Sequence, residues 1–522
     1  MASRTELRVE FDRRRWTIAA VLRRYFSRLL LMAGAVHAID PDKRATPCKP
    51  ASGRIRSGSA PGLVCLITSL HLRLQSAGSV ILGAICVFVL FVAPGCHKKN
   101  QAAPEVLLTI IDQSWVDKES QAILSEELKR FTDETGIRVQ VMPAPEVAAD
   151  QLETWRNLLE SGAKVPDVYG IDVIWPGILA EHLIDLKAYL PEQEIAAHFP
   201  ELIKNNTVNG RLVALPNNLG EGILFYRVDL LQKYGYTVPP KTWEELEKMA
   251  KRIQAGERAK GNKDFWGYVW QGAPSEALTC NALEWQVAEG GGTILDDNGR
   301  PTVNNPSAIR AWGRAARWVG SISPPGVLAY KEWDAFNIWQ AGNAAFMRNW
   351  PNAYVAARAR SSPTRDRFNI APMPAGRAGL ATALGGQGYG VSRYSSHPRE
   401  AAMLVRFLTG RNEQARRCRK SSNPPTIPEL YKDPEVLAQN PYFSGISLAY
   451  RQGATVRPST AAGKKYPDVS RAYFEAVHAV LSHKKSASQA AAELEQELTR
   501  ILERPSHSPN ASRDQEHPLA QR

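Results

Sequence analysis

The sequence predicts an α/β protein whose sheets are largely parallel. Three observations after residue 105 lead to this prediction: short apolar runs, segments that repeat apolar residues every three or four positions, and the alternation of the two kinds of segment. A run of about six apolar residues suits a buried strand, whereas the longer repeat suits a helix with one apolar face. Strands that alternate with helices are typical of parallel sheets covered by helices.

The first elements follow one another in this pattern, and the first helix is expected to end at Gly136, which supplies a left-handed stop. In order, we expect a strand at 106–111, a helix at 119–135, a strand over Ile137, Val139 and Val141, a helix through Leu152, Trp155, Leu158 and Leu159, and a strand at 167–175. Ligands of such sheets sit beyond the carboxyl ends of the strands, which places Trp115 and the segment 172–175 near one crevice.

Later helices carry recognisable start signals, which are side chains that accept hydrogen bonds from the first backbone N–H groups. The expected caps are Thr242 with Glu245 in a capping box, Asn305 before Pro306, and Ser488 at the start of a charged amphipathic helix at 488–502. Trp312 and Trp318 lie on an apolar helix face, so we interpret them as packing residues rather than ligand contacts.

The length of 522 residues predicts at least two domains, and the net charge of +13 raises the question of nucleic-acid binding. The excess positive charge lies mainly in the first 95 residues. Residues 1–95 hold 14 Lys and Arg against 5 Asp and Glu, which leaves only +4 for the remaining 427 residues. Binding to nucleic acid usually needs a strongly basic surface, so a nearly neutral body predicts a protein that does not bind nucleic acid.

The front of the chain has the layout of an export signal. Residues 1–66 lack a sustained period and are expected to be disordered or a mis-annotated extension, with a true start near residue 66. Residues 67–95 contain the apolar run 79–92 followed by small residues, which indicates a signal or anchor segment. Gly95-Cys96 resembles a lipoprotein processing site, with Cys96 as the lipidated residue; an uncleaved anchor is the alternative. Residues 96–104 are expected to be a flexible tether, and 503–522 a disordered tail.

Cysteine spacing and short motifs indicate neither a metal site nor a cofactor. Only Cys280 and Cys418 follow the proposed processing site, which allows one disulfide but no framework of several. The sequence contains no CxxC, HExxH, GxGxxG, GxxxxGK[ST] or GxSxG motif. We therefore predict a protein without cofactor, metal or catalytic residues.

Longer segments carry a specific resemblance. The stretch 209–253, NGRLVALPNNLGEGILFYRVDLLQKYGYTVPPKTWEELEKMAKRI, resembles the central signature of the family 1 extracellular solute-binding proteins of bacterial ABC importers. Further similar segments are GGGTILDDNGRPTVNNPSAIRAW at 290–312, FNIWQAGNAAFMRNWPNAY at 336–354, GYGVSRYSSHPREAAMLVRFLTG at 388–410 and NPPTIPELYKDPEV at 423–436. Together they cover nearly all of 105–500. The segments GIDVIWPG, YVWQG, CNALEW and RNWPNAY are most similar to the trehalose/maltose-binding subgroup.

The resemblance implies a periplasmic-binding-protein-like fold of type II, in which two discontinuous α/β lobes are joined by a hinge and close around a sugar. We expect the first crossing between the lobes near Leu215-Pro216. The implied N-terminal lobe comprises 105–215 and 388–425, and the C-terminal lobe 216–387 and 426–502.

A sugar presents apolar faces and a rim of hydroxyls, so its site needs flat aromatic rings with polar groups at their edges. The candidate ligand-binding residues are Trp115, Asp172, Trp175, Glu221, Trp270, Trp350, Gln387 and Arg457. Trp350 lies in a loop-like segment, which favours ligand contact over packing, whereas Trp175 and Trp270 suit either role. Asp172 suits a ligand contact or a turn cap equally well.

Relatives in the resembled family carry an acidic residue at the position of Gly220, and the adjacent Glu221 is the candidate to replace it. Arg457 matches a family position that reaches the cleft, with a surface arginine as the alternative. Glu276 and Glu284 are weaker candidates, which we interpret as ordinary helix charges.

The expected function is that of a monomeric extracytoplasmic receptor, anchored to the cell membrane through a lipid or an N-terminal anchor. It would bind a di- or oligosaccharide and deliver it to the permease subunits of an ABC importer. Two other classes stay open at this point: a carbohydrate-active hydrolase, which would use paired carboxylates, and a sugar sensor that works without an importer.

Overall fold

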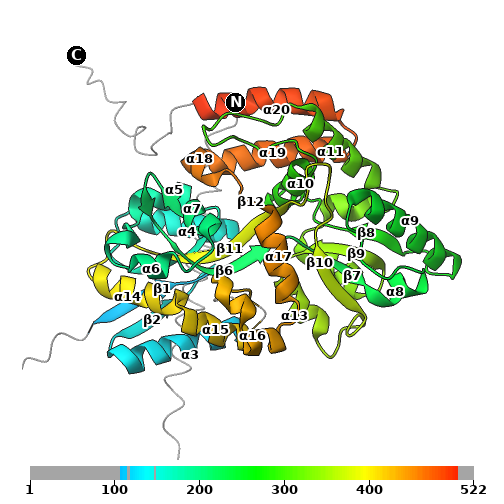
Figure 1. The fold of residues 1–522 in the computed structure, drawn as a ribbon. Coiled ribbons are helices and arrows are strands. Elements are labelled where there is room, and N and C mark those ends of the chain that lie inside the picture. The colour runs from blue at the N-terminus through cyan, green and yellow to red at the C-terminus, as the bar shows by residue number, and fades with distance from the viewer. Residues whose placement is uncertain (1–105, 114–117, 146–147, 422, 504–522) are drawn as a thin grey trace, which may run out of the picture. The chain divides into compact units, whose positions relative to one another are not determined.

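The computed structural model describes residues 106–113, 118–145, 148–421 and 423–503. All of them belong to one compact unit of the chain. They form two lobes, each with its own β-sheet, and long strands run from one lobe towards the other (Figure 1). The predicted two-lobed type II α/β fold is thereby confirmed.

The N-terminal lobe contains a mixed sheet in the order β12-β11-β3-β1-β2, with β6 on the other edge of β11. As the alternation of elements predicted, β1 pairs in parallel with both β2 and β3. β11 joins them in the antiparallel direction. The strands are β1 (Leu107–Ile111), β2 (Arg138–Met142), β3 (Val168–Asp172), β6 (Leu215–Glu221), β11 (Thr382–Val391) and β12 (Ala454–Thr455).

Helices cover both faces of this sheet. Ile110 packs with the side chains of α3 and α14, whereas the next residue, Ile111, packs with those of α4, because successive strand residues point to opposite faces. The other elements of this lobe surround these layers. The helices and short strands are α3 (Lys118–Thr135), α4 (Ala148–Glu160), α5 (Pro176–Leu179), α6 (Glu192–Ile195), α7 (Pro200–Asn205), β4 (Thr207–Val208), β5 (Arg211–Leu212), α14 (Pro398–Thr409) and α15 (Arg411–Lys420), with 3-10 turns η1 (Ala180–His182) and η2 (Leu186–Ala188).

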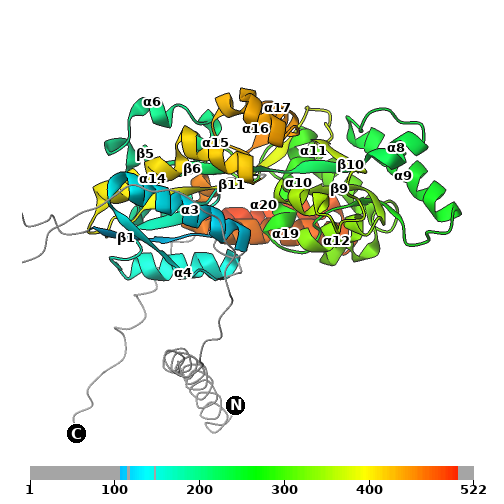
Figure 2. The same ribbon diagram turned by 90° about the horizontal axis from the view of Figure 1, so that it is seen from below.

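The C-terminal lobe is built on a sheet in the order β10-β7-β9-β8 (Figure 1), and Figure 2 shows the same lobe from below. Its strands are β7 (Ile223–Arg227), β8 (Trp266–Val269), β9 (Ala344–Asn349) and β10 (Phe368–Pro372). β7 pairs antiparallel with both β9 and β10, and β8 pairs in parallel with β9, so the prediction of largely parallel sheets is wrong for this lobe. Its helices are α8 (Val228–Lys233), α9 (Trp243–Ala259), α10 (Glu276–Ala288), α11 (Pro306–Trp318), α12 (Glu332–Gln340), α13 (Asn352–Arg358), α16 (Pro434–Gln439), α17 (Phe443–Gly453), α19 (Tyr466–Leu481) and α20 (Ala487–Glu503), with 3-10 turns η3 (Pro325–Ala329) and η4 (Pro428–Lys432).

The backbone crosses between the lobes along β6 and β11, which pair with each other from Leu215 to Glu221. β6 leads into β7 through Gly222, so the N-terminal sheet extends beyond the expected boundary at 215/216. A third connection differs from the expected division at 426–502. There α18 (Ser459–Ala462) and η5 (Gly463–Lys465) pack on α5 of the N-terminal lobe before α19 returns to the other lobe.

Most predicted elements are confirmed, and three details differ for local reasons. β3 stops at Asp172 because its carboxylate accepts a hydrogen bond from the Ile174 N–H, which closes a turn. The last helix begins at Ala487, and Ser486 rather than Ser488 caps it by accepting from the Gln489 N–H. The third difference lies in the capping box of α9, where Thr242 caps the helix as predicted but Glu245 accepts from the Lys241 N–H instead of the Thr242 N–H. Asn305 caps α11 as predicted, and Trp312 and Trp318 are buried. Cys280 and Cys418 are buried and free.

Within the described part of the chain, none of the helices is both long enough and apolar enough to cross a membrane. The expected extension 1–66, signal or anchor segment 67–95, tether 96–104 and tail beyond 503 lie outside the described residues.

The contact between α5 and α18 leaves no space for a side chain at Gly177. A Cβ atom there would lie 2.3 Å from the backbone oxygen of Ser459. We expect Gly177→Ala to lower the free energy of unfolding by about 1–3 kcal/mol, as overpacking does. Gly313→Ala in α11 is the control: its Cβ would meet nothing closer than 3.9 Å, and a helical alanine should add about 0.5–1 kcal/mol. Urea unfolding measures both, and equal stability of the two variants would contradict the account.

Candidate ligand-binding site

A cavity of about 710 Å³ lies between the two lobes, within the range of about 300–1,000 Å³ found for small-molecule sites. Both lobes and both crossing strands contribute to its wall. Its polar and aromatic lining includes Gln113, Ser120, Asp172, Trp175, Asn218, Glu276, Glu332, Trp350, Asn352, Gln387, Asn423, Arg457, Tyr466 and Ser470. Of the sequence-predicted residues, the structure therefore brings together Asp172, Trp175, Trp350, Gln387 and Arg457.

Three polar side chains form a row across adjacent strands at one wall of the cavity. Asp172 on β3 lies opposite Gln387 on β11, which in turn lies opposite Asn218 on β6. The Asn218 Oδ1 accepts a hydrogen bond from the Gln387 N–H at 2.9 Å, which orients the asparagine. We name Asp172, Asn218 and Gln387 the polar row. It offers carboxylate and amide groups, which suit a ligand with many hydroxyls.

Asp172 caps a turn, which is one of the two roles that the sequence left open, and it also lines the cavity. One carboxylate oxygen, Oδ1, accepts from the Ile174 N–H at 3.1 Å. Burial raises the pKa of Asp172, and the positive charge of Arg457 opposes that shift. A ligand hydroxyl that donated to this carboxylate would replace part of the water that burial removes.

Two tryptophan rings border the cavity. Trp175 begins the short helix α5, is almost fully buried, and packs edge-on against Trp155 with ring centroids 6.0 Å apart. Trp350 follows β9 and is half-buried. The Arg348 guanidinium lies 4.0 Å from the centre of its ring, and a Cβ at Gly385 would come within 3.0 Å of the same ring. Both indoles are therefore held rigidly, which suits platforms for the apolar face of a ligand.

The support of Trp350 is a buried ion pair that sequence reasoning did not foresee. Arg348 donates to Glu284 from Nη2 at 2.6 Å and from Nε at 3.1 Å, and both side chains are fully buried. The same carboxylate accepts from the Ala383 N–H of β11 at 3.0 Å. Glu284, interpreted from the sequence as an ordinary helix charge, therefore connects α10, β9 and a crossing strand behind the cavity. The helical period of α10 does not reveal this role, because nearly all of its residues are buried.

Arg457 is not a surface arginine. It is 6% exposed, and its guanidinium donates to Glu276 Oε1 at 2.7 Å and to the Leu384 carbonyl at 3.0 Å. Glu276 also accepts from the hydroxyls of Tyr466 and Ser470. Glu276, a weaker candidate in the sequence, thus lines the cavity with its carboxylate fully engaged. The sequence signal that could have placed Glu276 at the cavity is its position as the first residue of α10, directly after Ser275 at the N-cap.

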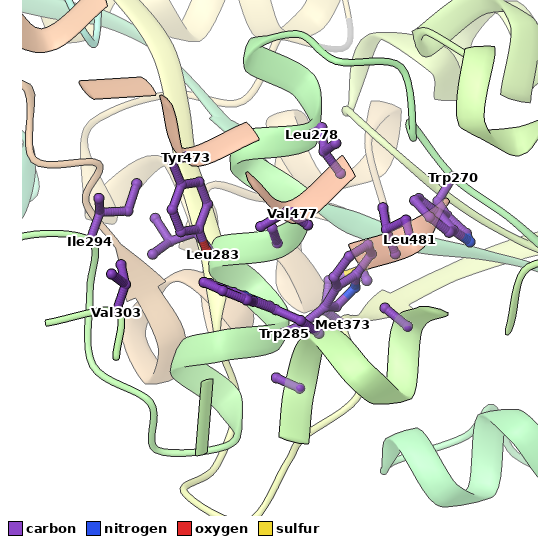
Figure 3. Close-up of a cluster of buried hydrophobic side chains, with 14 of the residues drawn as sticks. Trp270, Leu278, Leu283, Trp285, Ile294, Val303, Met373, Tyr473, Val477 and Leu481 are labelled. Carbon is purple, nitrogen blue, oxygen red and sulfur yellow. The ribbon is translucent and has the colours of Figure 1, made fainter. Parts of the chain in front are cut away.

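Two predicted residues lie away from the cavity. Trp270 is fully buried in the core of the C-terminal lobe, where it donates to Ser323 Oγ and packs edge-on against Trp285 (Figure 3). Glu221 is also fully buried, and its strand register turns it away from the polar row. Successive side chains of a strand point to opposite faces, so Glu221, one residue after Gly220, points away from the face that a side chain at position 220 would occupy. Trp115 and Cys96 lie outside the described residues.

Glu221 occupies an unusual environment. Among the described residues, neither oxygen of its carboxyl has a hydrogen-bond partner, and burial raises its pKa well above 4.5. Tyr431 and Tyr450 are close enough for the carboxyl to affect their ionisation. The neutral, protonated form is therefore favoured in the folded state.

Within the residues that the structure describes, no group of three or more His, Cys, Asp or Glu side chains is placed to hold a metal ion.

Comparisons with known proteins place this geometry in context. Residues 115–415 match the model of the bacterial extracellular solute-binding protein family. A probable ABC transporter-binding protein of Deinococcus radiodurans is 46% identical over 381 residues, which are 72% of this chain and 90% of the relative. A probable amino-acid ABC transporter periplasmic-binding protein of Sinorhizobium fredii, y4oP, is 26% identical over 411 residues, covering 74% of this chain and 87% of the relative. Maltose-bound MalE3 of T. maritima superimposes with a TM-score of 0.68 at 34% identity, over 76% of this chain and all of that one.

Breaking the ion pair behind Trp350 should destabilise the protein strongly. We expect Glu284→Gln to lower the free energy of unfolding by about 3–5 kcal/mol, because Arg348 would keep a buried charge without its counter-ion. The double variant Glu284→Leu/Arg348→Met should recover much of that loss. The surface pair Asp468 and Arg471 is the control, where Asp468→Asn should cost less than about 1 kcal/mol. Denaturant titration checks these values, and a loss at Glu284 as small as at Asp468 would contradict the role of the pair.

The buried carboxyl of Glu221 predicts a pH dependence of stability. The pKa of Glu221 is raised in the folded state. Its contribution to the free energy of unfolding is therefore fully present below the unfolded-state pKa of about 4.3 and is lost as pH rises through the folded-state pKa. Glu221→Gln, which has no such proton, should melt at a higher temperature than the wild type at pH 7, and the difference should vanish near pH 4. The exposed Glu475→Gln serves as the control, and melting curves between pH 4 and 8 are the measurement. A constant difference across that range would refute the assignment.

Proposed function

Because the chain belongs to the bacterial extracellular solute-binding proteins, we propose that it is the sugar receptor of an ABC importer and that it binds a di- or oligosaccharide in the cavity between its lobes. The observation that carries the proposal is the pairing, in one cavity, of two rigid indoles with the polar row. Trp175 and Trp350 suit the apolar faces of pyranose rings, and Asp172, Asn218 and Gln387 suit their hydroxyls.

The charges of the cavity favour an uncharged sugar over an amino acid. Its described lining contains three carboxyl groups, from Asp172, Glu276 and Glu332, and a single guanidinium. That guanidinium, of Arg457, already donates to Glu276 and to the Leu384 carbonyl. The ammonium group of an amino acid could pair with one of these carboxyl groups, but its carboxylate would meet no free cation among these residues, and an unpaired buried charge is costly. The relative named for amino acids is therefore a poor guide to the ligand of this chain.

The same contacts argue against a hydrolase that would use Glu276 as its acid. A glycosidase needs one carboxyl group that can give up a proton and a second one opposite it. Glu276 is tied to Arg457, Tyr466 and Ser470 and so is poorly placed to act as an acid. We propose that the chain binds and releases its sugar unchanged, closing by rotation of the lobes about β6 and β11. The permease subunits of the importer would recognise the closed form.

The family is extracytoplasmic, and we propose that this chain is tethered to the cell membrane. The supporting feature is the apolar run 79–92 followed by Gly95-Cys96, which suits either lipidation of Cys96 or retention as an anchor. Mass spectrometry of the mature N-terminus would distinguish the two forms.

Isothermal titration with trehalose, maltose, glucose and a set of amino acids tests the ligand class. We expect one of the disaccharides to bind with a Kd on the order of 1 μM, about −8 kcal/mol, and amino acids not to bind. Trp350→Ala should weaken binding at least about tenfold, because it removes a platform.

Trp266→Ala is the matched control, since Trp266 is also half-buried under an arginine but does not line the cavity. Its affinity for the disaccharide should equal that of the wild type. Binding of an amino acid, or of none of the sugars, would contradict the proposed ligand and leave the family and fold unchanged.

A further inference from the structure

Trp333 is the most exposed of the large hydrophobic side chains that stand out on the described surface, at 54%. It is the second residue of α12, and its ring meets Phe336 edge-on with centroids 5.3 Å apart. Phe336 itself is buried. The indole is therefore anchored at one edge while much of its surface meets water. Burial of an indole is usually favourable, so an indole that is held in place and yet stays exposed calls for a functional explanation.

The backbone that carries Trp333 is joined directly to the cavity wall. Glu332, the preceding residue, lines the cavity. Asn349 donates from Nδ2 to the Glu332 carbonyl at 3.0 Å, which ties the start of α12 to the residue before the platform Trp350. Asp334 accepts from the Lys331 N–H at 2.9 Å and fixes the first turn of the helix. Trp333 thus follows directly on a residue of the cavity wall, in a segment of the C-terminal lobe that these hydrogen bonds hold, and its own ring lies outside the described lining.

The surroundings of Trp333 suit a small ligand better than a protein partner. The other exposed residues at this end of α12 are polar: Lys331, Asp334 and Asn337. A protein interface needs a contiguous surface of about 800 Å² on each partner with an apolar centre. A single flat ring amid polar groups instead matches what one sugar unit needs, which is a platform for its apolar face and polar partners for its hydroxyls.

We propose that Trp333 is an outer platform of the ligand site, which stacks on a sugar unit that extends from the cavity past Glu332. This inference rests on the proposed sugar-binding function and deepens it: the ligand is an oligosaccharide longer than two units. The inner units occupy the space between Trp175, Trp350 and the polar row, and the outer unit contacts Trp333.

Isothermal titration of the purified full chain with maltose, maltotriose and maltotetraose tests the proposal. The wild type should bind the longer sugars more tightly than maltose. Trp333→Ala should leave the affinity for maltose within twofold, and should weaken that for the longest sugar about tenfold, so that the gain with length disappears. Trp333→Phe should retain part of the gain. Because the ring is exposed, the melting temperature of either variant without sugar should match that of the wild type.

The outcomes separate the two proposals. If Trp350→Ala weakens all three sugars while Trp333→Ala changes none, the outer platform is refuted and the sugar receptor stands. Equal weakening of all three sugars by Trp333→Ala, or no gain with length in the wild type, also refutes the platform. If the wild type binds none of the three sugars, the platform is refuted, and the proposed ligand class fails with it only if trehalose does not bind either.

Discussion

The buried ion pair between Glu284 and Arg348 is the constraint on which the geometry of the site depends. Each charge is fully buried, so each requires the other, and their hydrogen bonds reach α10, β9 and the Ala383 N–H of β11. The guanidinium also lies under the ring of Trp350. A Cβ at Gly222 would come within 2.0 Å of the Glu284 carboxylate, so the turn between β6 and β7 is shaped around the same pair. One interaction thereby positions Trp350 and both crossing strands relative to the C-terminal lobe.

Glycine makes the close approach of the crossing strands possible. At Gly220 and Gly386 a side chain would meet the backbone of the partner strand at 2.9 Å and 2.3 Å, and Gly386 also has a positive φ of 112°. These strands carry the polar row, and Trp350 packs over Gly385 between them. At Gly220, Gly385 and Gly386 these strands therefore line the cavity with backbone, which leaves room for a ligand beside the polar row.

The sequence was informative where a pattern is local and weak where a role depends on tertiary contacts. Periodicity and caps predicted β1, α3, β2 and α4 closely, and the loop position of Trp350 indicated a residue that does line the cavity. Trp270 and Glu221 could not be assigned in this way, because an aromatic ring and a carboxylate look the same in sequence whether they face a cleft or a core. Glu276 and Glu284 were ranked as helix charges, since their partners Arg457 and Arg348 lie far away in the chain. The third connection at α18 was missed for the same reason.

We propose above all that a sugar binds between the lobes and that its binding makes the lobes close. Lys129 of α3 and Lys251 of α9 are both exposed and lie in different lobes. Each would be replaced by a cysteine that carries a spin label, in a chain whose four cysteines before residue 100 are replaced by serine, and the distance between the labels would be measured. Cys280 and Cys418 are buried and should not react. The account predicts that the sugar which binds in titration shifts this distance distribution, and that Trp350→Ala raises the sugar concentration required. If the protein is saturated with the sugar and the distribution of distances between the labels does not change, the proposed closure is contradicted.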